Sequence, residues 1–244
     1  MTIKNIVLFI LFLGFTNGFS QSYELVKCKN DKEIIKHFAY TLSYSEQDEQ
    51  AYWVAYELKG ENIGDGVERA DKFVPDPLVK MGSATNSDYK KSGYDRGHLA
   101  PAADMKWSSV AMKECFYYSN MSPQVPSFNR GIWKKLEEKV RVWAKEKGVL
   151  YIATGPVLSG TMANIGPNKV SVPNYYYKAI LFNNGAQSKA IGFYLPNEGV
   201  DKSILSFAIT IDKLEEMTGL DFFYNLPDNV ESSIESKLDL NYWK

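Results

Sequence analysis

The most informative stretch of the chain reads Tyr94-Asp95-Arg96-Gly97-His98-Leu99-Ala100-Pro101. Arginine matches the geometry of phosphate oxygens, and histidine is the side chain whose proton moves most easily near pH 7. Because glycine lacks a side chain, we expect Gly97 to allow a tight turn and to leave space beside the imidazole. The segment predicts chemistry on a phosphodiester. The alternative is a turn with an Asp95–Arg96 ion pair and a structural core histidine.

A helix is predicted downstream, over residues 130–147, with Gly148 at its end. One buried stripe supports it, formed by Ile132, Leu136, Val140 and Trp143. Asn129 stands directly before the helix, and Glu137 leans back toward it from about 12 Å along the axis. That separation suits Asn129 as the ligand of an ion and Glu137 as the holder of a water on that ion. The alternative for Asn129 is a helix cap, and the alternative for Glu137 is an ion pair with Arg141 or with charges on the side of Arg130.

Aromatic and branched residues predict strands on both sides of this helix. The predicted strands cover residues 37–44, 52–58, 149–155, 176–182, 190–195 and about 207–211. A hairpin turn is expected at Asn183-Asn184-Gly185, and a short helix at 212–218 closed by Gly219. The fold class is therefore α+β, an antiparallel sheet flanked by helices. Since residues 21–244 contain no repeat or linker, we expect them to form a single domain.

The N-terminus has the layout of a secretory signal peptide. Lys4 precedes the apolar run 6–13, and the small residues Gly18 and Ser20 stand before a cleavage site at Gln21. We therefore expect residues 1–20 to be removed and the mature chain to be secreted or periplasmic. An uncleaved anchor is the alternative, and no stable membrane association is expected of the mature chain.

Charge is unevenly distributed along the chain, whose net charge is −1. Residues 86–147 carry twelve Lys and Arg against seven Asp and Glu. By contrast, residues 41–70 carry two against seven, and residues 198–244 carry four against ten. The basic segment contains Arg96 and His98, which favours a polyanion at that place.

Cysteine and histidine usage leaves one question open and argues against one class of site. Cys28 and Cys115 could form a disulfide in an oxidising compartment or stay as buried thiols. Two cysteines and two histidines far apart in sequence have no ligand spacing for structural zinc.

Three motifs at this order and spacing resemble the DNA/RNA non-specific endonuclease family. They are Tyr94–Ala102, Ser119-Asn120-Met121-Ser122-Pro123-Gln124, and Phe128-Asn129-Arg130-Gly131-Ile132-Trp133 followed by Leu136-Glu137. The family comprises the ββα-metal (His-Me finger) nucleases, which include secreted bacterial nucleases and mitochondrial endonuclease G. The similarity covers residues 37–224, and every catalytic position of the family is present.

The resemblance implies a role for each matching residue. His98 corresponds to the general base, Asn129 to the only direct protein ligand of Mg²⁺, and Glu137 to the carboxylate that holds a metal-bound water. Mn²⁺ or another divalent ion is expected to substitute for Mg²⁺. The remaining matches stabilise the phosphate, support the site or bind substrate, and they are Arg69, Arg96, Asn120 and Arg130.

The expected function is therefore Mg²⁺-dependent, sequence-non-specific hydrolysis of DNA and RNA to 5′-phosphate products. One alternative is a catalytically weak extracellular nucleic-acid-binding protein on the same fold. Another is a serine hydrolase, which the absence of a Gly-x-Ser-x-Gly sequence disfavours. The sequence leaves open the preference between DNA and RNA or between single and double strands, the biological role, and a possible homodimer.

Overall fold

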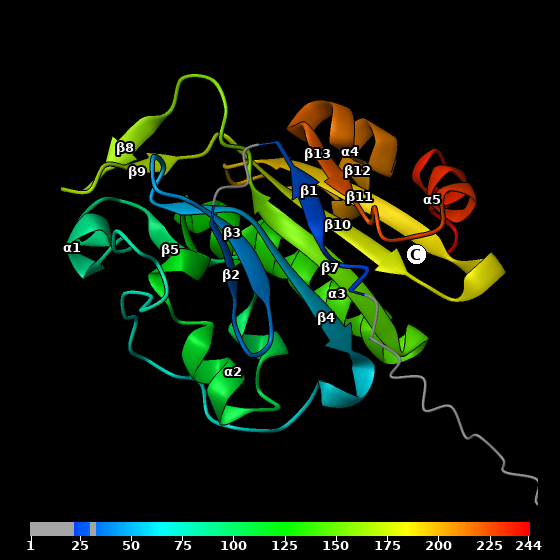
Figure 1. The fold of residues 1–244 in the computed structure, drawn as a ribbon, viewed down its shortest axis with the longest axis horizontal. Coiled ribbons are helices and arrows are strands. Elements are labelled where there is room, and N and C mark those ends of the chain that lie inside the picture. The colour runs from blue at the N-terminus through cyan, green and yellow to red at the C-terminus, as the bar shows by residue number, and fades with distance from the viewer. Residues whose placement is uncertain (1–21, 30–32) are drawn as a thin grey trace, which may run out of the picture.

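The computed structural model describes residues 22–29 and 33–244, so the expected signal peptide lies outside the described residues. Its centre is an antiparallel sheet of seven strands in the order β12-β11-β10-β7-β4-β3-β2 (Figure 1). These strands are β2 (Glu33–Lys36), β3 (Thr41–Ser45), β4 (Gln50–Lys59), β7 (Val149–Pro156), β10 (Tyr175–Phe182), β11 (Lys189–Pro196) and β12 (Ala208–Ile209). In the described part of the chain, no helix has the length and apolar character needed to cross a membrane.

Both faces of the sheet are buried, because successive residues of a strand point to opposite sides. In β4, Val54 and Tyr56 belong to one apolar cluster, whereas Trp53 and Ala55 belong to the other. The strands therefore have nearly continuous apolar sequences instead of alternating with polar residues. Burial on both faces also fixes their register, since a shift of one residue would exchange the two sets.

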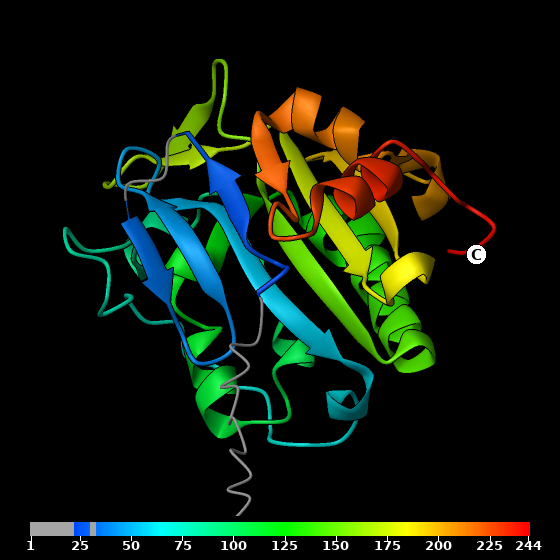
Figure 2. The ribbon, with the colours of Figure 1, turned by 45° about the vertical axis from the view of Figure 1, so that its right-hand side comes forward.

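Helices cover both faces, as Figure 2 shows. The long helix α3 (Lys134–Lys147) and the short α2 (Ser109–Glu114) pack on the first cluster. The second cluster lies under α4 (Ile211–Thr218), α5 (Asp228–Glu235) and a small sheet of β1 (Val26–Cys28) and β13 (Leu220–Phe222). The shorter elements are η1 (Gly60–Asn62), α1 (Asn86–Tyr89), η2 (Ala102–Asp104), η3 (Tyr118–Asn120), β8 (Ala163–Ile165), β9 (Val170–Val172), η5 (Gly185–Gln187) and η6 (Ile204–Phe207).

A ββα unit lies on the α3 side of the sheet. Strand β5 (Asp95–His98) pairs with β6 (Met121–Gln124), and the chain then passes through a six-residue π turn, η4 (Phe128–Trp133), into α3. The backbone leaves helical geometry at Gly131, so the helix predicted from residue 130 begins at Lys134. Asn129 consequently lies within the turn and not at a helix cap, and a spacing along one regular helix does not describe its relation to Glu137.

Other expectations differ in detail. The first predicted strand begins at Thr41 and not at residue 37, because His37 and the residues after it form the turn between β2 and β3. The strand expected at 207–211 contains only β12. Cys28 and Cys115 do not form a disulfide with each other. Cys115 is buried, and its thiol donates to the carbonyl of Met112 at 3.2 Å.

Gly97 occupies a strand and not the tight turn expected from its sequence. It pairs with Ser122, and a Cβ atom at this position would lie 2.2 Å from the Cδ and Oε1 atoms of Gln124. The missing side chain therefore makes room for a buried glutamine on the partner strand.

Replacing Gly97 with alanine is expected to lower the free energy of unfolding by about 1–3 kcal/mol, because the added methyl group overpacks the β5–β6 pair. Urea denaturation of the variant measures this. In a chain that already carries Gln124→Ala, the added methyl group no longer meets the glutamine side chain. The double variant Gly97→Ala/Gln124→Ala should therefore be about as stable as Gln124→Ala alone. Unchanged stability of Gly97→Ala would contradict the steric explanation.

Candidate active site

His98 is the last residue of β5, and its ring lies among aromatic side chains. The ring centres of Phe116 and Phe73 are 4.8 Å and 5.7 Å from that of the imidazole. The residue is 9% exposed, and its Nε2 atom has no hydrogen-bond partner within the described chain. Burial, together with the nearby positive charge of Arg69, lowers the pKa of His98 to about 3. The imidazole is therefore neutral near pH 7 and able to accept a proton.

The depressed pKa of His98 makes stability depend on pH. Below pH 6.5 an unfolded chain protonates this histidine while the folded chain does not, so stability falls as the pH drops from 6.5 toward 3. The contribution is at most about 1.4 kcal/mol per pH unit. Between pH 6.5 and 5, we expect the wild type to lose about 2 kcal/mol more than His98→Gln in urea denaturation. Parallel pH curves for the two proteins would contradict the shift.

Two arginines lie beside the histidine. Arg96, on β5, donates from Nε to the hydroxyl of Tyr118 at 3.2 Å and from Nη2 to Asn86. Its guanidinium carbon lies 5.3 Å from the ring centre of Phe73, so hydrogen bonds and an aromatic face both orient it. Arg69 is exposed, and its guanidinium carbon lies 5.0 Å from the ring centre of Phe116. Each guanidinium keeps N–H groups available for a phosphate.

Asp95 connects β5 to the π turn. It accepts from Nδ2 of Asn129 at 2.9 Å and from Nε and Nη2 of Arg130 at 2.8 Å and 2.6 Å. Burial raises the pKa of Asp95, but these hydrogen bonds outweigh burial and leave the pKa below its ordinary value. An ionised carboxylate only accepts hydrogen bonds, so the amide nitrogen of Asn129 must face it. The amide oxygen is left as a possible ligand for a cation.

Arg130 is therefore placed at the site, but its planar fork is directed at Asp95. The two hydrogen bonds use Nε and Nη2, while the side chain remains 72% exposed. Contact with substrate would use its remaining N–H groups. Asp95 therefore forms its ion pair with Arg130 across the ββα unit, and not with Arg96 as in the alternative interpretation of the sequence.

Glu137 lies in the first turn of α3, next to a buried polar cluster formed by Asp104, Arg141 and Lys178. No described residue donates a hydrogen bond to its carboxylate, which leaves the oxygens available for water. Burial raises its pKa, and the positive charges of Lys178, Arg141 and Arg69 oppose that rise. Arg141 forms an ion pair with the buried Asp104 at 2.9 Å and none with Glu137 within the described residues, so the alternative interpretation of Glu137 as a partner of Arg141 is not supported.

Lys178 belongs to this cluster from its position on β10 and is 1% exposed. Its Nζ atom has no hydrogen-bond partner in the described structure and lies 4.8 Å from the ring centre of Trp133. Burial lowers its pKa, and the carboxylates of Glu137 and Asp104 oppose that effect. Sequence reasoning missed Lys178, although one charge within the apolar strand Tyr175–Phe182 was a usable signal.

Asn120 fixes the backbone next to His98 through hydrogen bonds of its side-chain amide. Its Nδ2 donates to the carbonyls of Ala100 and Cys115 at 3.0 Å and 2.8 Å, and its Oδ1 accepts from the Ala100 N–H at 2.9 Å. The residue is fully buried. These bonds use both amide hydrogens, so Asn120 holds the segment that follows His98 in place.

Comparison with known proteins identifies the family of this chain. The family model of the DNA/RNA non-specific endonucleases matches residues 22–229. The chain belongs to the DNA/RNA non-specific endonuclease family. It is therefore a metal-dependent nuclease that hydrolyses phosphodiester bonds.

Relatives within the family come from bacteria, fungi and animals. A nuclease of Nostoc sp. is 33% identical over 87% of this chain and 81% of its own length. Mitochondrial endonuclease G of Homo sapiens is 37% identical over 77% of this chain and 68% of its own length. A crystal structure of an EndoG/EndoGI complex, described as showing the mechanism of EndoG inhibition, aligns with a TM-score of 0.75. The match has 30% identity and covers 80% of this chain and 86% of that one.

Proposed function

We propose that this nuclease is an exported, Mg²⁺-dependent endonuclease that cleaves DNA and RNA without sequence preference and leaves 5′-phosphate ends. The observation that carries the proposal is the buried imidazole of His98, whose Nε2 atom has no hydrogen-bond partner within the described residues and which lies beside Arg69 and Arg96. A neutral base next to two guanidinium groups suits activation of water against a phosphodiester. Export rests on the sequence of residues 1–20.

The residues present fit a hydrated divalent cation. Asn129 offers one neutral amide oxygen because Asp95 takes its nitrogen, and Glu137 offers carboxylate oxygens without hydrogen-bond partners in the described chain. Mg²⁺ prefers oxygen ligands and keeps several waters, which suits one direct ligand and one carboxylate acting through water. Mn²⁺ is expected to substitute, since oxygen ligands also suit it.

Each residue of the candidate site has its own role in the proposed reaction. His98 accepts the proton of the attacking water, and Arg69 and Arg96 stabilise the negative charge that grows on the phosphate. Asn120 holds the backbone after His98, while Asp95 orients Asn129. When bound, the cation supplies Lewis-acid stabilisation of the phosphate and of the leaving 3′-oxygen. Because these groups contact phosphate and not the bases, binding depends little on the nucleotide sequence and weakens as the salt concentration rises.

Plasmid cleavage by the purified mature chain tests this function. With Mg²⁺, supercoiled plasmid should become nicked and then fragmented, and EDTA should stop the reaction. End analysis should find 5′-phosphates, and an RNA substrate should also be cut. Absence of cleavage of both substrates across several divalent metals would refute the proposal in favour of binding alone. Sedimentation of the same sample tests the possible homodimer.

A further inference from the structure

Three carboxylates meet where α4 and α5 pack beside each other, away from the ββα unit. Asp212 and Glu215 lie one turn apart on α4, and Glu235 is the last residue of α5. Each contributes a carboxylate oxygen, and these oxygens all lie within 4.8 Å of one another. Figures 1 and 2 show α4 in orange and α5 in red as neighbours in both views.

Glu235 gives this cluster its unusual character. The residue is only 7% exposed, and its Oε1 atom has no hydrogen-bond partner in the described chain. A buried carboxylate oxygen without a partner is costly, so such groups are normally paired or bound to a metal. Glu215 is held in place, since its Oε1 accepts from the N–H of Phe222 at 2.8 Å. The cluster is thus a partly formed shell of oxygens with one oxygen unsatisfied.

The surrounding charges are also negative. Burial and the carboxylates of Glu215, Glu231 and Asp212 raise the pKa of Glu235 to about 9. Lys213, the lysine of α4, forms an ion pair with Glu216 at 2.7 Å. The acidic side chains around Glu235 therefore repel one another. Within the described residues, no lysine or arginine forms a hydrogen bond with Asp212, Glu215 or Glu235.

We propose that Asp212, Glu215 and Glu235 bind a divalent cation of the size of Ca²⁺, which ties α4 to α5. Carboxylate oxygens are the ligands that Ca²⁺ prefers, at about 2.3–2.6 Å, so opposite ligands stand about 4.6–5.2 Å apart. The cluster lies within that span, and waters complete the coordination. Because α4 and α5 cover the sheet face opposite α3, this site stabilises the fold and is separate from the nuclease centre.

Thermal unfolding with added ions tests the site without using nuclease activity. The Asn129→Ala variant is the background, because it lacks the direct ligand proposed for the active site. In this background, Ca²⁺ is expected to raise the unfolding temperature by roughly 3–8 °C relative to EDTA, and Mg²⁺ by less. Adding Glu235→Gln should remove the Ca²⁺ shift and raise the unfolding temperature in EDTA, since it removes a buried carboxyl group whose raised pKa disfavours folding near neutral pH.

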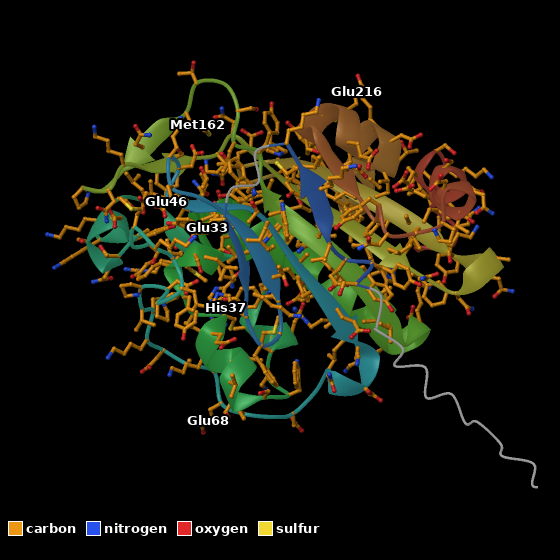
Figure 3. All side chains as sticks on the ribbon, viewed as in Figure 1. Glu33, His37, Glu46, Glu68, Met162 and Glu216 are labelled. Atoms are coloured by element: carbon orange, nitrogen blue, oxygen red, sulfur yellow. The ribbon has the colours of Figure 1, made fainter. Side chains whose placement is uncertain are left out.

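Glu216→Gln is the matched control on the same helix. Figure 3 shows Glu216 on the outer side of α4, and its side chain is 69% exposed, so this variant should keep the full Ca²⁺ shift. Asp212→Asn, at an exposed position, should weaken the shift and provides a second variant if Glu235→Gln does not fold. An unfolding temperature that is equal in Ca²⁺ and EDTA would overturn the proposal. So would a Ca²⁺ shift that survives in both Glu235→Gln and Asp212→Asn.

Discussion

His98→Ala is expected to lower the rate of plasmid cleavage by about 10²–10⁴-fold or more, because it removes the proposed general base. The substitution also leaves a cavity beside Phe73 and Phe116, the aromatic neighbours of the ring. Imidazole added to the assay should enter this cavity and restore part of the rate. Initial rates at saturating Mg²⁺, with and without imidazole, measure both effects.

The second histidine of the chain provides the control. His37, labelled in Figure 3, is buried, and its Nε2 lies 2.9 Å from the Asp76 carboxylate. That environment is structural, so His37→Gln should change stability while the rate per folded molecule stays near the wild-type value. A His98→Ala protein that cleaves within a few-fold of wild type would exclude the general-base role.

Asn129→Ala is expected to raise the Mg²⁺ concentration for half-maximal activity by at least about 10–100-fold, the loss seen when even indirect partners of a metal are removed. The structure supports this because the amide oxygen of Asn129 is the atom left free when its nitrogen donates to Asp95. Cleavage rates across a Mg²⁺ titration give the midpoint. Glu137→Gln should shift it in the same direction, since its carboxylate is proposed to hold a metal-bound water.

Asp95→Asn separates positioning from direct binding. Its amide oxygen still accepts from Asn129, but the charge that pairs with Arg130 is lost. We therefore expect a smaller shift in the Mg²⁺ midpoint than for Asn129→Ala. An unchanged midpoint in Asn129→Ala would show that Asn129 is not a metal ligand.

Most strands of the sheet and two of its covering helices, α3 and α4, were predicted because local patterns specify them, whereas α2 and α5 were not predicted. Aromatic and branched runs indicated the four strands β4, β7, β10 and β11, and Gly148 and Gly219 marked the ends of α3 and α4. The start of α3 was not predictable. The apolar stripe continues through Ile132, so periodicity alone does not show that the backbone departs from a helix at Gly131.

The residues of the candidate site were found from motifs, but their pairing depends on tertiary contacts. An ion pair between the neighbours Asp95 and Arg96 was the alternative interpretation of the sequence, whereas the folded chain brings Asn129 and Arg130 to Asp95 from another element. Lys178 illustrates the same limit. It lies far along the chain from Glu137, and only the position of β10 behind α3 places the two charges together.

The buried thiol of Cys115 makes the floor of the candidate site observable. Burial raises the pKa of this thiol to about 12, and the Cys115 carbonyl is held by the Asn120 amide that also binds Ala100. A thiolate-directed reagent can therefore modify Cys115 only when this region opens. In a chain carrying Cys28→Ser, the rate of Cys115 alkylation therefore measures how often the region beneath the candidate site opens, without any measurement of catalysis.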